Sequence, residues 1–282
     1  MDPDAPLQPG LYVVATPIGN LRDVTLRALD VLRGADLVLA EDTRVSGKLL
    51  HAHGVKARLT PYHEHNAAEA RPRVLAALAE GKAVAMIADA GTPLISDPGY
   101  RLVREVVEAG HSVVPIPGAS ALLSALVVAG LPTDRFLFAG FPPPRGAARR
   151  TFLAELAPLR ATLIFYEGAS RVGESLADML AAFGDRRLAV ARELTKLYET
   201  VVRGPLSVLA ADPALQTPKG EIVIVVAPGM EAAATEADAD AALAEALTRL
   251  SPAEAASEVA RALGLPRRDL YRRAVAIKDG LR

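Results

Sequence analysis

Short apolar runs alternate with amphipathic segments along the first half of the chain. The apolar runs are only four to six residues long and are bounded by turn residues, which predicts strands, and the segments between them carry apolar residues at helical spacing. Such an alternation is typical of a parallel α/β sheet. The predicted strands are residues 11–16, 37–40, 83–88 and 112–115, and the predicted helices are residues 24–32, 44–52, 67–78, a segment after Pro98, and residues 119–129.

A break at residues 130–134 precedes a second set of elements. Two of its strands, near residues 190 and 201, lie close enough in the chain to pair as a hairpin, so the second sheet is expected to be mixed. The predicted strands are residues 136–139, 162–166, 188–192, 200–203 and 221–226, and the predicted helices are residues 147–157, 171–182 and 205–211.

Residues 228–240 are small, acidic and poor in large apolar groups, which predicts a linker. Three amphipathic helices are expected after it, at residues 241–250, 253–263 and 267–277, and the tight turn at Gly264 suggests a helix-turn-helix-like unit. The sequence therefore divides into an α/β domain at residues 1–131, a second at 132–229, and the linker with a basic helical domain at 230–282.

The composition of the chain excludes several kinds of site and of protein. With 282 residues, 51% of them hydrophobic, the chain can bury more than one core. The absence of cysteine excludes disulfides, thiolate metal sites and cysteine nucleophiles, and a net charge of -1 gives no global attraction to nucleic acid. No signal peptide pattern opens the chain and no apolar run reaches the roughly 18 residues of a membrane span, so we expect a cytoplasmic protein without a membrane segment.

The segment after the predicted strand at 83–88 carries the most chemistry. Asp89 and Asp97 supply acceptors, Gly91 allows close approach of the backbone, and Pro93 stiffens the path at the carboxyl end of a strand, where open α/β sheets bind ligands. A simple strand-to-helix turn is the alternative. Nucleotide motifs of the G-x-G-x-x-G or G-x-x-x-x-G-K-[ST] type do not occur.

Eight strings occur in one order along the chain: TPIGNLRD (16–23), AEDTR (40–44), YHEHN (62–66), DAGTPLISDPG (89–99), PIPGASA (115–121), FYE (165–167), ARELTK (191–196) and KGE (219–221). With these strings the chain resembles the RsmI-type 16S ribosomal RNA cytidine 2'-O-ribose methyltransferases, a branch of the tetrapyrrole methylase fold, over essentially its whole length. The resemblance implies two α/β domains with an S-adenosylmethionine cleft between them, a small helix-turn-helix-like domain, a homodimer, and the decoding region of the small ribosomal subunit as substrate.

The resemblance also implies where the cofactor binds. The contacts would come from both halves of the chain: Pro17, Asp89, Ala90, Gly91, Ile95, Ser120, Ala121, Tyr166, Leu194 and Gly220. Each position has an ordinary structural alternative, because Pro17 can belong to a turn, Ser120 can cap a helix and Leu194 can be core. Members of the family often carry a histidine after the FYE string, where this chain has Gly168-Ala-Ser-Arg171.

Methylation of a ribose hydroxyl needs an oriented oxygen and a route for its proton. The candidates are polar groups of the eight strings, and Glu41, Arg44, Glu193 and Lys196 are chosen from them, with the base itself unassigned. The others are Asp42, His63, Glu64, His65, Glu167 and Arg192. The alternatives are a helix N-terminus with a surface ion pair for Asp42 and Arg44, and an interdomain salt bridge for Glu193 and Lys196. His51 and His53, and likewise His63 and His65, share a face without completing a ligand set, so no metal is expected.

The last helix carries Arg267, Arg268, Arg272 and Arg273, which are candidates for RNA phosphates. Their alternative is to complement a helix dipole. Two other functions stay open: methylation of a corrin or porphyrin precursor, and a non-catalytic RNA-binding role in ribosome assembly.

Overall fold

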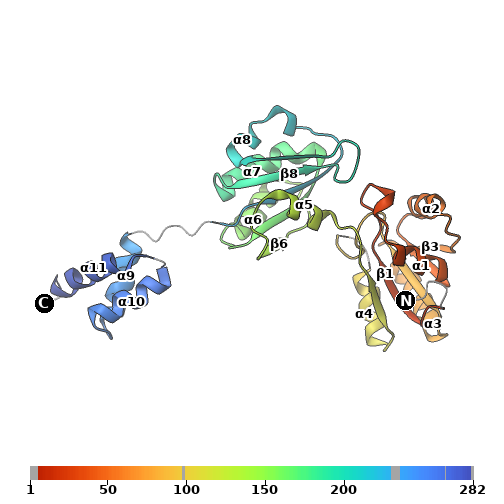
Figure 1. Ribbon diagram of the computed structural model, residues 1–282, viewed down its shortest axis with the longest axis horizontal. Coiled ribbons are helices and arrows are strands. Elements are labelled where there is room, and N and C mark those ends of the chain that lie inside the picture. The colour runs from red at the N-terminus through yellow and green to blue at the C-terminus, as the bar shows by residue number, and fades with distance from the viewer. Residues whose placement is uncertain (1–5, 97–98, 230–235, 264, 281–282) are drawn as a thin grey trace. The chain divides into compact units, whose positions relative to one another are not determined.

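The computed structural model of the chain describes residues 6–96, 99–229, 236–263 and 265–280. Its contacts divide the chain into two compact units, Met1–Pro228 and Gly229–Arg282. The first unit contains two five-stranded sheets, and the second is helical (Figure 1). Within the described residues, no helix is long and apolar enough to cross a membrane.

The first sheet is parallel throughout, with the strand order β3-β2-β4-β1-β5, which confirms the predicted layout. The pattern of the sequence missed β3, because three residues that end in a proline are too few to show an alternation. The strands are β1 (Gly10–Val14), β2 (Leu37–Ala40), β3 (Leu59–Pro61), β4 (Ala83–Ile87) and β5 (Val113–Ile116). The connecting helices are η1 (Leu21–Asp23), α1 (Leu26–Gly34), α2 (Thr43–Ala52), α3 (Ala67–Ala79) and α4 (Tyr100–Glu108).

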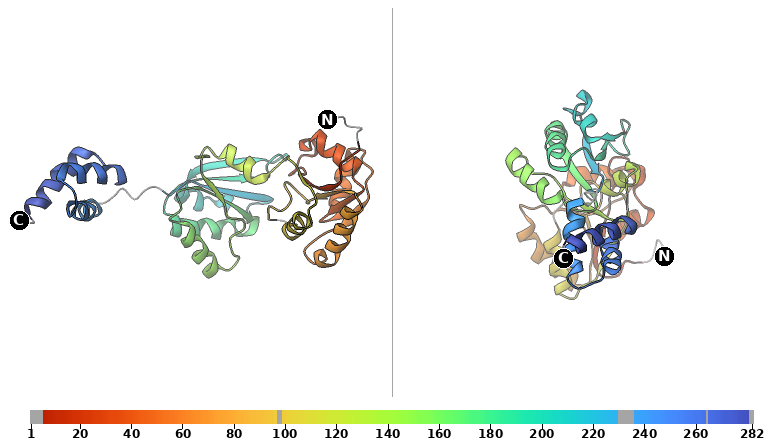
Figure 2. Two further views of the ribbon diagram at one scale, coloured as in Figure 1. Left: turned by 90° about the horizontal axis from the view of Figure 1, so that it is seen from below. Right: turned by 90° about the vertical axis from the view of Figure 1, so that its left-hand side faces the viewer.

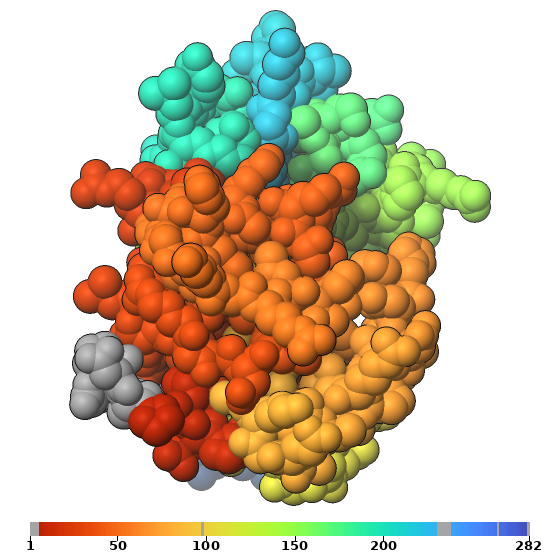
Figure 3. All heavy atoms as spheres, turned by 90° about the vertical axis from the view of Figure 1, so that its right-hand side faces the viewer, coloured from red at the N-terminus to blue at the C-terminus, as the bar shows by residue number. Residues whose placement is uncertain are grey.

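Helices cover both faces of this sheet, which explains why all five residues of β4 are buried. On one face, side chains of α1 and α2 such as Leu32 and Leu50 pack against Val14. On the other face, Leu78 of α3 and Leu102 of α4 belong to a separate cluster. In the space-filling view of Figure 3, the red-to-orange segments that include α2 and α3 form most of the visible face.

The second sheet has the order β6-β7-β10-β8-β9 and is mixed. Only β6 and β7 run parallel; the other neighbours are antiparallel, and β8 and β9 form the expected hairpin. The strands are β6 (Phe136–Phe138), β7 (Thr162–Gly168), β8 (Arg187–Arg192), β9 (Thr200–Pro205) and β10 (Glu221–Val226). The helices are α6 (Gly146–Leu156), η2 (Ala169–Arg171), α7 (Val172–Phe183), α8 (Leu206–Ala210) and η3 (Pro213–Leu215).

The helix α5 (Ala121–Ala129) joins the two sheets into one unit. It follows β5 of the first sheet in the chain, but it packs on β8 and β10 of the second (Figures 1 and 2). Its buried side chains Leu122 and Leu126 share a core with Ile18, which comes from the loop after β1. The predicted domain boundary between residues 131 and 132 therefore lies just after a helix that packs in the core of the second sheet.

The second unit consists of α9 (Glu236–Leu247), α10 (Pro252–Leu263) and α11 (Arg267–Gly280). Our linker prediction is wrong for residues 236–240, where the chain is helical; residues 230–235, and Gly264 in the predicted turn, lie outside the described residues. Alanine and glutamate are strong helix formers, and Ala239 is buried with Leu243, Val259 and Leu270 in the core of this unit. The acidic stretch is therefore part of a helix whose Ala239 and Leu243 are buried against the other two helices.

A buried arginine holds α6 against α7. The side chain of Arg149 is only 3% exposed; its Nε donates to Asp178 Oδ2 at 2.7 Å and its Nη2 donates to Glu174 Oε2 at 3.1 Å. The neighbouring Arg150 contacts the same Asp178 at 3.4 Å from an exposed position.

We predict that Arg149→Ala lowers the free energy of unfolding of the first unit by about 3–5 kcal/mol, because it removes a buried side chain and leaves the partly buried Asp178 without its closest partner. Arg150→Ala is the matched control and should cost less than about 1 kcal/mol, as exposed ion pairs do. Urea denaturation of both variants checks this. Equal losses in the two variants would contradict the role given to Arg149.

Candidate active site

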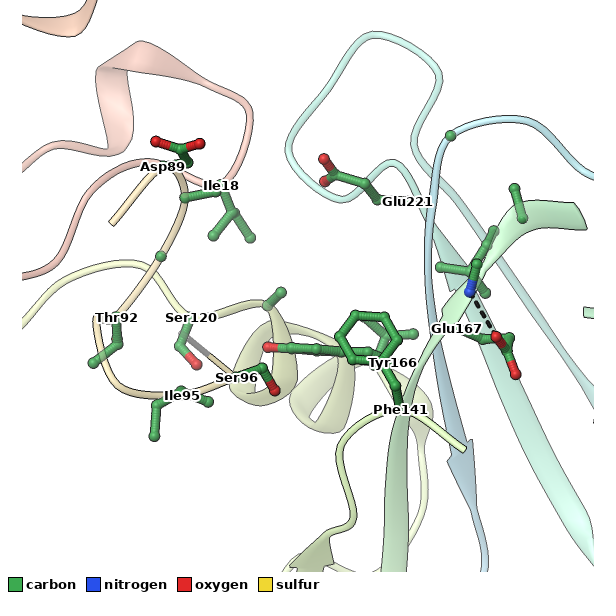
Figure 4. A pocket seen from close by; sticks show the side chains of 18 of the residues that line it. Ile18, Asp89, Thr92, Ile95, Ser96, Ser120, Phe141, Tyr166, Glu167 and Glu221 are labelled. Atoms are coloured by element: carbon green, nitrogen blue, oxygen red, sulfur yellow. Dashed lines mark hydrogen bonds between the residues drawn. The ribbon is translucent and has the colours of Figure 1, made fainter. Parts of the chain in front are cut away.

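A cavity of about 520 Å³ lies within the first unit, between loops of the first sheet and strands of the second. Figure 4 shows Ile18, Asp89, Thr92, Ile95, Ser96 and Ser120 on one side, facing Phe141, Tyr166, Glu167 and Glu221 on the other. The first group comes from the loops that follow β1, β4 and β5. The site is thus built at the carboxyl ends of parallel strands, where open α/β sheets bind ligands.

Backbone pairing holds the first two loops together. Thr16 and Gly91 each donate their N–H to the carbonyl of the other, at 2.8 and 3.0 Å, and the hydroxyl of Thr16 donates to Ala88 O at 3.1 Å. Gly91 has φ of +80°, which favours glycine, and a Cβ there would lie 3.2 Å from Ile18 Cγ2. The third loop joins them through Thr92, whose hydroxyl donates to Ala119 O at 3.2 Å.

The loop after β4 also stores backbone strain. Leu94 and Ser96 have φ of 72° and 67°, in the left-handed region of backbone angles that residues other than glycine rarely adopt. Between them, Ile95 lines the cavity from an exposed position. Strained residues of this kind cluster at ligand sites, where the surrounding structure holds them in place.

Two carboxylates of the first sheet meet at the edge of the cavity. Asp89 Oδ1 accepts a hydrogen bond from the backbone N–H of Asp42 at 2.9 Å, which ties the loop after β4 to the start of α2. The neighbouring Glu41 is partly buried, and this burial, followed by the nearby charge of Asp89, raises the pKa of the Glu41 carboxyl above its usual 4.5. Glu41 is therefore the carboxylate at this edge whose proton affinity is increased.

Aromatic rings and a second buried carboxylate form the opposite wall. The rings of Phe141 and Tyr166 pack edge to face with their centroids 5.5 Å apart. Glu167 is fully engaged: it accepts from Gly168 N at 2.7 Å, from Arg171 Nε at 2.8 Å and from the hydroxyl of Ser175. Arg171 therefore pairs with Glu167 of this wall. It lies in the segment after the FYE string, where members of the family often carry a histidine.

The predicted pair Glu193 and Lys196 is an ion pair, and it extends to a third residue. Lys196 Nζ lies 2.9 Å from Glu193 Oε1 and 3.0 Å from Glu221 Oε2. Glu193 Oε1 also accepts from the backbone N–H of Glu221, and this bond, followed by Lys196, lowers the pKa of Glu193 below its usual 4.5. The aliphatic stem of Lys196 covers Gly19, where a Cβ would lie 2.5 Å from Lys196 Cγ. The pair therefore belongs to the contact between the two halves, beside the cavity.

Eight of the ten residues expected to touch a cofactor line the cavity: Asp89, Ala90, Gly91, Ile95, Ser120, Ala121, Tyr166 and Gly220. Pro17 is buried next to Ile18, which lines the cavity in its place. Leu194 does not line the cavity. It lies in the core that Ile18 shares with α5, which was the alternative given for it from the sequence. Arg44 is exposed and forms an ion pair with Asp42 at 2.6 Å, away from the cavity lining.

The lining residue Phe141 could not be found from the sequence. It follows β6 in a loop without a periodic pattern, and only the packing on Tyr166 places it in the wall. Thr92, Ser96 and Glu221 lie inside strings that we had singled out, so their proximity to the site was detectable. Among the described residues, no group of three or more His, Asp or Glu side chains is placed to hold a metal ion.

The arginines expected to bind RNA divide into two pairs. Arg272 contacts Asp269, and Arg273 donates to both oxygens of Asp240, at 2.8 and 2.7 Å, which joins α11 to α9. Arg267 and Arg268 are exposed and begin α11. The dipole alternative therefore fails for these two, because positive charge is stabilising at the end of a helix and not at its start.

Two families of known proteins match the chain. The Tetrapyrrole (Corrin/Porphyrin) Methylases match residues 10–210, and the RsmI C-terminal HTH domain matches residues 233–278. Crystal structures of uroporphyrin-III-C-methyltransferase from Thermus thermophilus (TM-score 0.54, 24% identity, 76% of this chain and 93% of that chain) and of cobalt precorrin-4 methyltransferase (TM-score 0.58, 20% identity, 77% and 94%) share the fold.

Curated relatives named Ribosomal RNA small subunit methyltransferase I match nearly the whole chain. The protein from Mesorhizobium japonicum is 52% identical over 98% of this chain and 95% of the relative, and that from Erythrobacter litoralis is 53% identical over 97% of each. The protein from Escherichia coli O157:H7 is 45% identical over 94% of each. The chain therefore belongs to the ribosomal RNA small subunit methyltransferase I family, within the tetrapyrrole methylases.

Proposed function

We propose that this small-subunit ribosomal RNA methyltransferase uses S-adenosylmethionine to methylate the ribose 2'-hydroxyl of a cytidine in the decoding region of 16S ribosomal RNA. The observation that carries the proposal is the match to relatives named as small-subunit methyltransferases over 98% of the chain, helical C-terminal unit included. A methylase of corrin or porphyrin precursors would share the cavity, but it would not need this C-terminal unit.

The residues around the cavity fit S-adenosylmethionine. Its adenine and the carbons beside its sulfonium need apolar walls, which Ile18, Ile95 and Val223 offer, and its cationic groups favour the nearby carboxylate of Asp89. Gly91 lets the backbone approach closely, and a volume of about 520 Å³ lies in the range of small-molecule sites. These residues would hold the cofactor, with the rings of Phe141 and Tyr166 opposite.

When bound, S-adenosylmethionine supplies a methyl carbon that the ribose oxygen attacks as the carbon–sulfur bond breaks. The hydroxyl proton has to leave, and the carboxylate of Glu41 is the acceptor that the cavity edge offers, because burial and Asp89 raise its affinity for a proton. The other predicted catalytic residues act indirectly: Glu193 and Lys196 hold the two halves in register, and Arg44 is oriented by Asp42.

The proposed function is tested by methyl transfer to small ribosomal subunits that lack the modification, followed by mapping of ribose methylation. We predict that Glu41→Gln lowers kcat about 10²–10⁴-fold, the usual contribution of a general base. In the parent, kcat should fall as the pH drops through the raised pKa of Glu41, because the protonated carboxyl cannot accept a proton. Glu69→Gln, in an exposed pair with Arg73, is the control and should behave as the parent.

We predict that Gly91→Val abolishes binding of S-adenosylmethionine while the fold survives, because the side chain would strain φ of +80° and press on Ile18. Gly81→Val is a matched control: Gly81 has φ of +79° with no atom within 4 Å of a Cβ, so it carries the same strain away from the cavity. Calorimetry with the cofactor separates the two. A folded Gly91→Val variant that binds like the parent would refute the assignment of this cavity.

We further propose that Arg267 and Arg268 contact RNA phosphates. Changing both to Ala should weaken binding of a small-subunit RNA fragment and flatten its log-log salt dependence by up to about 0.9 per lost phosphate contact, the value for duplex DNA, with unchanged cofactor affinity. Arg273→Ala should instead lower the melting temperature, since it removes the bond to Asp240. An unaltered salt slope in the double variant would remove the C-terminal unit from substrate recognition.

Two further expectations concern the whole molecule. We propose a homodimer, supported by exposed apolar residues such as Leu123 and Val127 on α5, since large apolar side chains that gather on a surface often mark an interface. Light scattering should give about twice the chain mass of 29.6 kDa, and a monomer mass at micromolar concentration would contradict it. A cytoplasmic location stays a prediction.

A further inference from the structure

A second cavity, of about 610 Å³, opens beside the first and shares Glu41 and Ser96 with it. Its other walls come from the turn after β3, which carries His63 and His65, and from the start of α4, which carries Tyr100 and Arg101. None of these four residues has a part in the site described above. A ligand in the second cavity would therefore meet a ligand in the first at Glu41 and Ser96.

Part of this lining is a rigid frame. Arg71 of α3 lies 2.8 Å from Glu105 of α4 and also contacts the hydroxyl of the buried Tyr62. Asn66 fixes the turn, because its Oδ1 accepts from His63 N at 2.8 Å and its Nδ2 donates to Pro61 O at 3.0 Å. These bonds hold the backbone of the turn at His63 in place.

Other groups of the lining have binding capacity that the fold leaves unused. Among the described residues, His63 Nδ1 is buried without a hydrogen-bond partner, and Arg101 has no ion pair. Tyr100 is 68% exposed, so its ring is accessible to a ligand.

The chemistry of these groups matches a single nucleotide. An exposed aromatic ring stacks on a base, an arginine binds phosphate, and a histidine hydrogen-bonds to hydroxyl or base edges. The carboxylate of Glu64, in the same turn, is of the type that accepts from the amino group of cytosine. Enzymes that modify one nucleotide within a structured nucleic acid commonly turn it out of its stack into such a pocket.

We propose that the second cavity binds the acceptor nucleotide of the RNA, with its base on Tyr100, its phosphate at Arg101 and its ribose at Glu41 and Ser96. The inference rests on the proposed function and adds the place of the substrate to it. The ribose hydroxyl would then reach the boundary of the two cavities, where Glu41 stands.

The test compares Tyr100→Ala and Arg101→Ala with the parent in steady-state methyl transfer to small-subunit RNA and in calorimetry with S-adenosylmethionine. Each variant should raise KM for RNA about ten-fold, the size of one lost stacking or phosphate contact, while the Kd of the cofactor stays unchanged. Tyr100→Phe keeps the ring and should restore the parental KM.

Arg104→Ala is the matched control, because Arg104 lies one turn further along α4, pairs with Glu108 at 3.5 Å and lines neither cavity. It should leave KM and kcat unchanged. A parent without methyl transfer would overturn the proposed function itself. An active parent whose KM for RNA is unaffected by Tyr100→Ala and Arg101→Ala would overturn only the second cavity as the nucleotide site.

Discussion

The site depends on the mutual backbone hydrogen bonds between Thr16 and Gly91. These two bonds join the loops that follow β1 and β4, and the hydroxyl of Thr16 closes the junction on Ala88. The pairing requires φ of +80° at position 91 and a residue without a side chain beside Ile18, so glycine satisfies both demands at once. Because the strands are parallel and adjacent, one junction at their carboxyl ends shapes a single wall of the cavity.

The opposite wall depends on α5, which leaves the first sheet and packs on the second. Hydrophobic burial of Leu122 and Leu126 holds the two sheets in one unit, and Ile18 enters the same core. The stem of Lys196 over Gly19 adds a second contact between the halves. The cavity walls are therefore held by packing on both sides, which keeps Asp89 and Tyr166 facing each other across it.

The carboxylates near the site differ in role, and the difference follows from their hydrogen-bond partners and their surroundings. Glu167 is neutralised by Arg171 and two further donors, and Glu193 by Lys196 and a backbone N–H, so both serve the structure. Asp89 accepts from the start of α2. Glu41 is the one whose pKa is raised by burial and by a neighbouring charge, which is the environment of a group that exchanges a proton.

The sequence by itself determined the strands, the helices and the loops that carry the chemistry. Periods of hydrophobic residues located β4 and β10, and glycines, prolines and a carboxylate marked residues 89–99, because these signals depend only on near neighbours in the chain. The strings that resemble the methyltransferase family led to eight of the residues that line the cavity. Local signals were weakest where an element is short, as in β3, or acidic and rich in alanine, as at residues 236–240.

Only the tertiary structure decided which residues of those loops face one another. It brought Phe141 into the wall, placed Leu194 in the core and joined Glu193 to Glu221 through Lys196, contacts that the local pattern of the sequence does not specify. It also separated Arg273, held by Asp240, from Arg267 and Arg268. The physical reason is that a pocket or an ion pair is defined by contacts between distant parts of the chain, whereas the periodicity of a sequence records only which side of each element is buried.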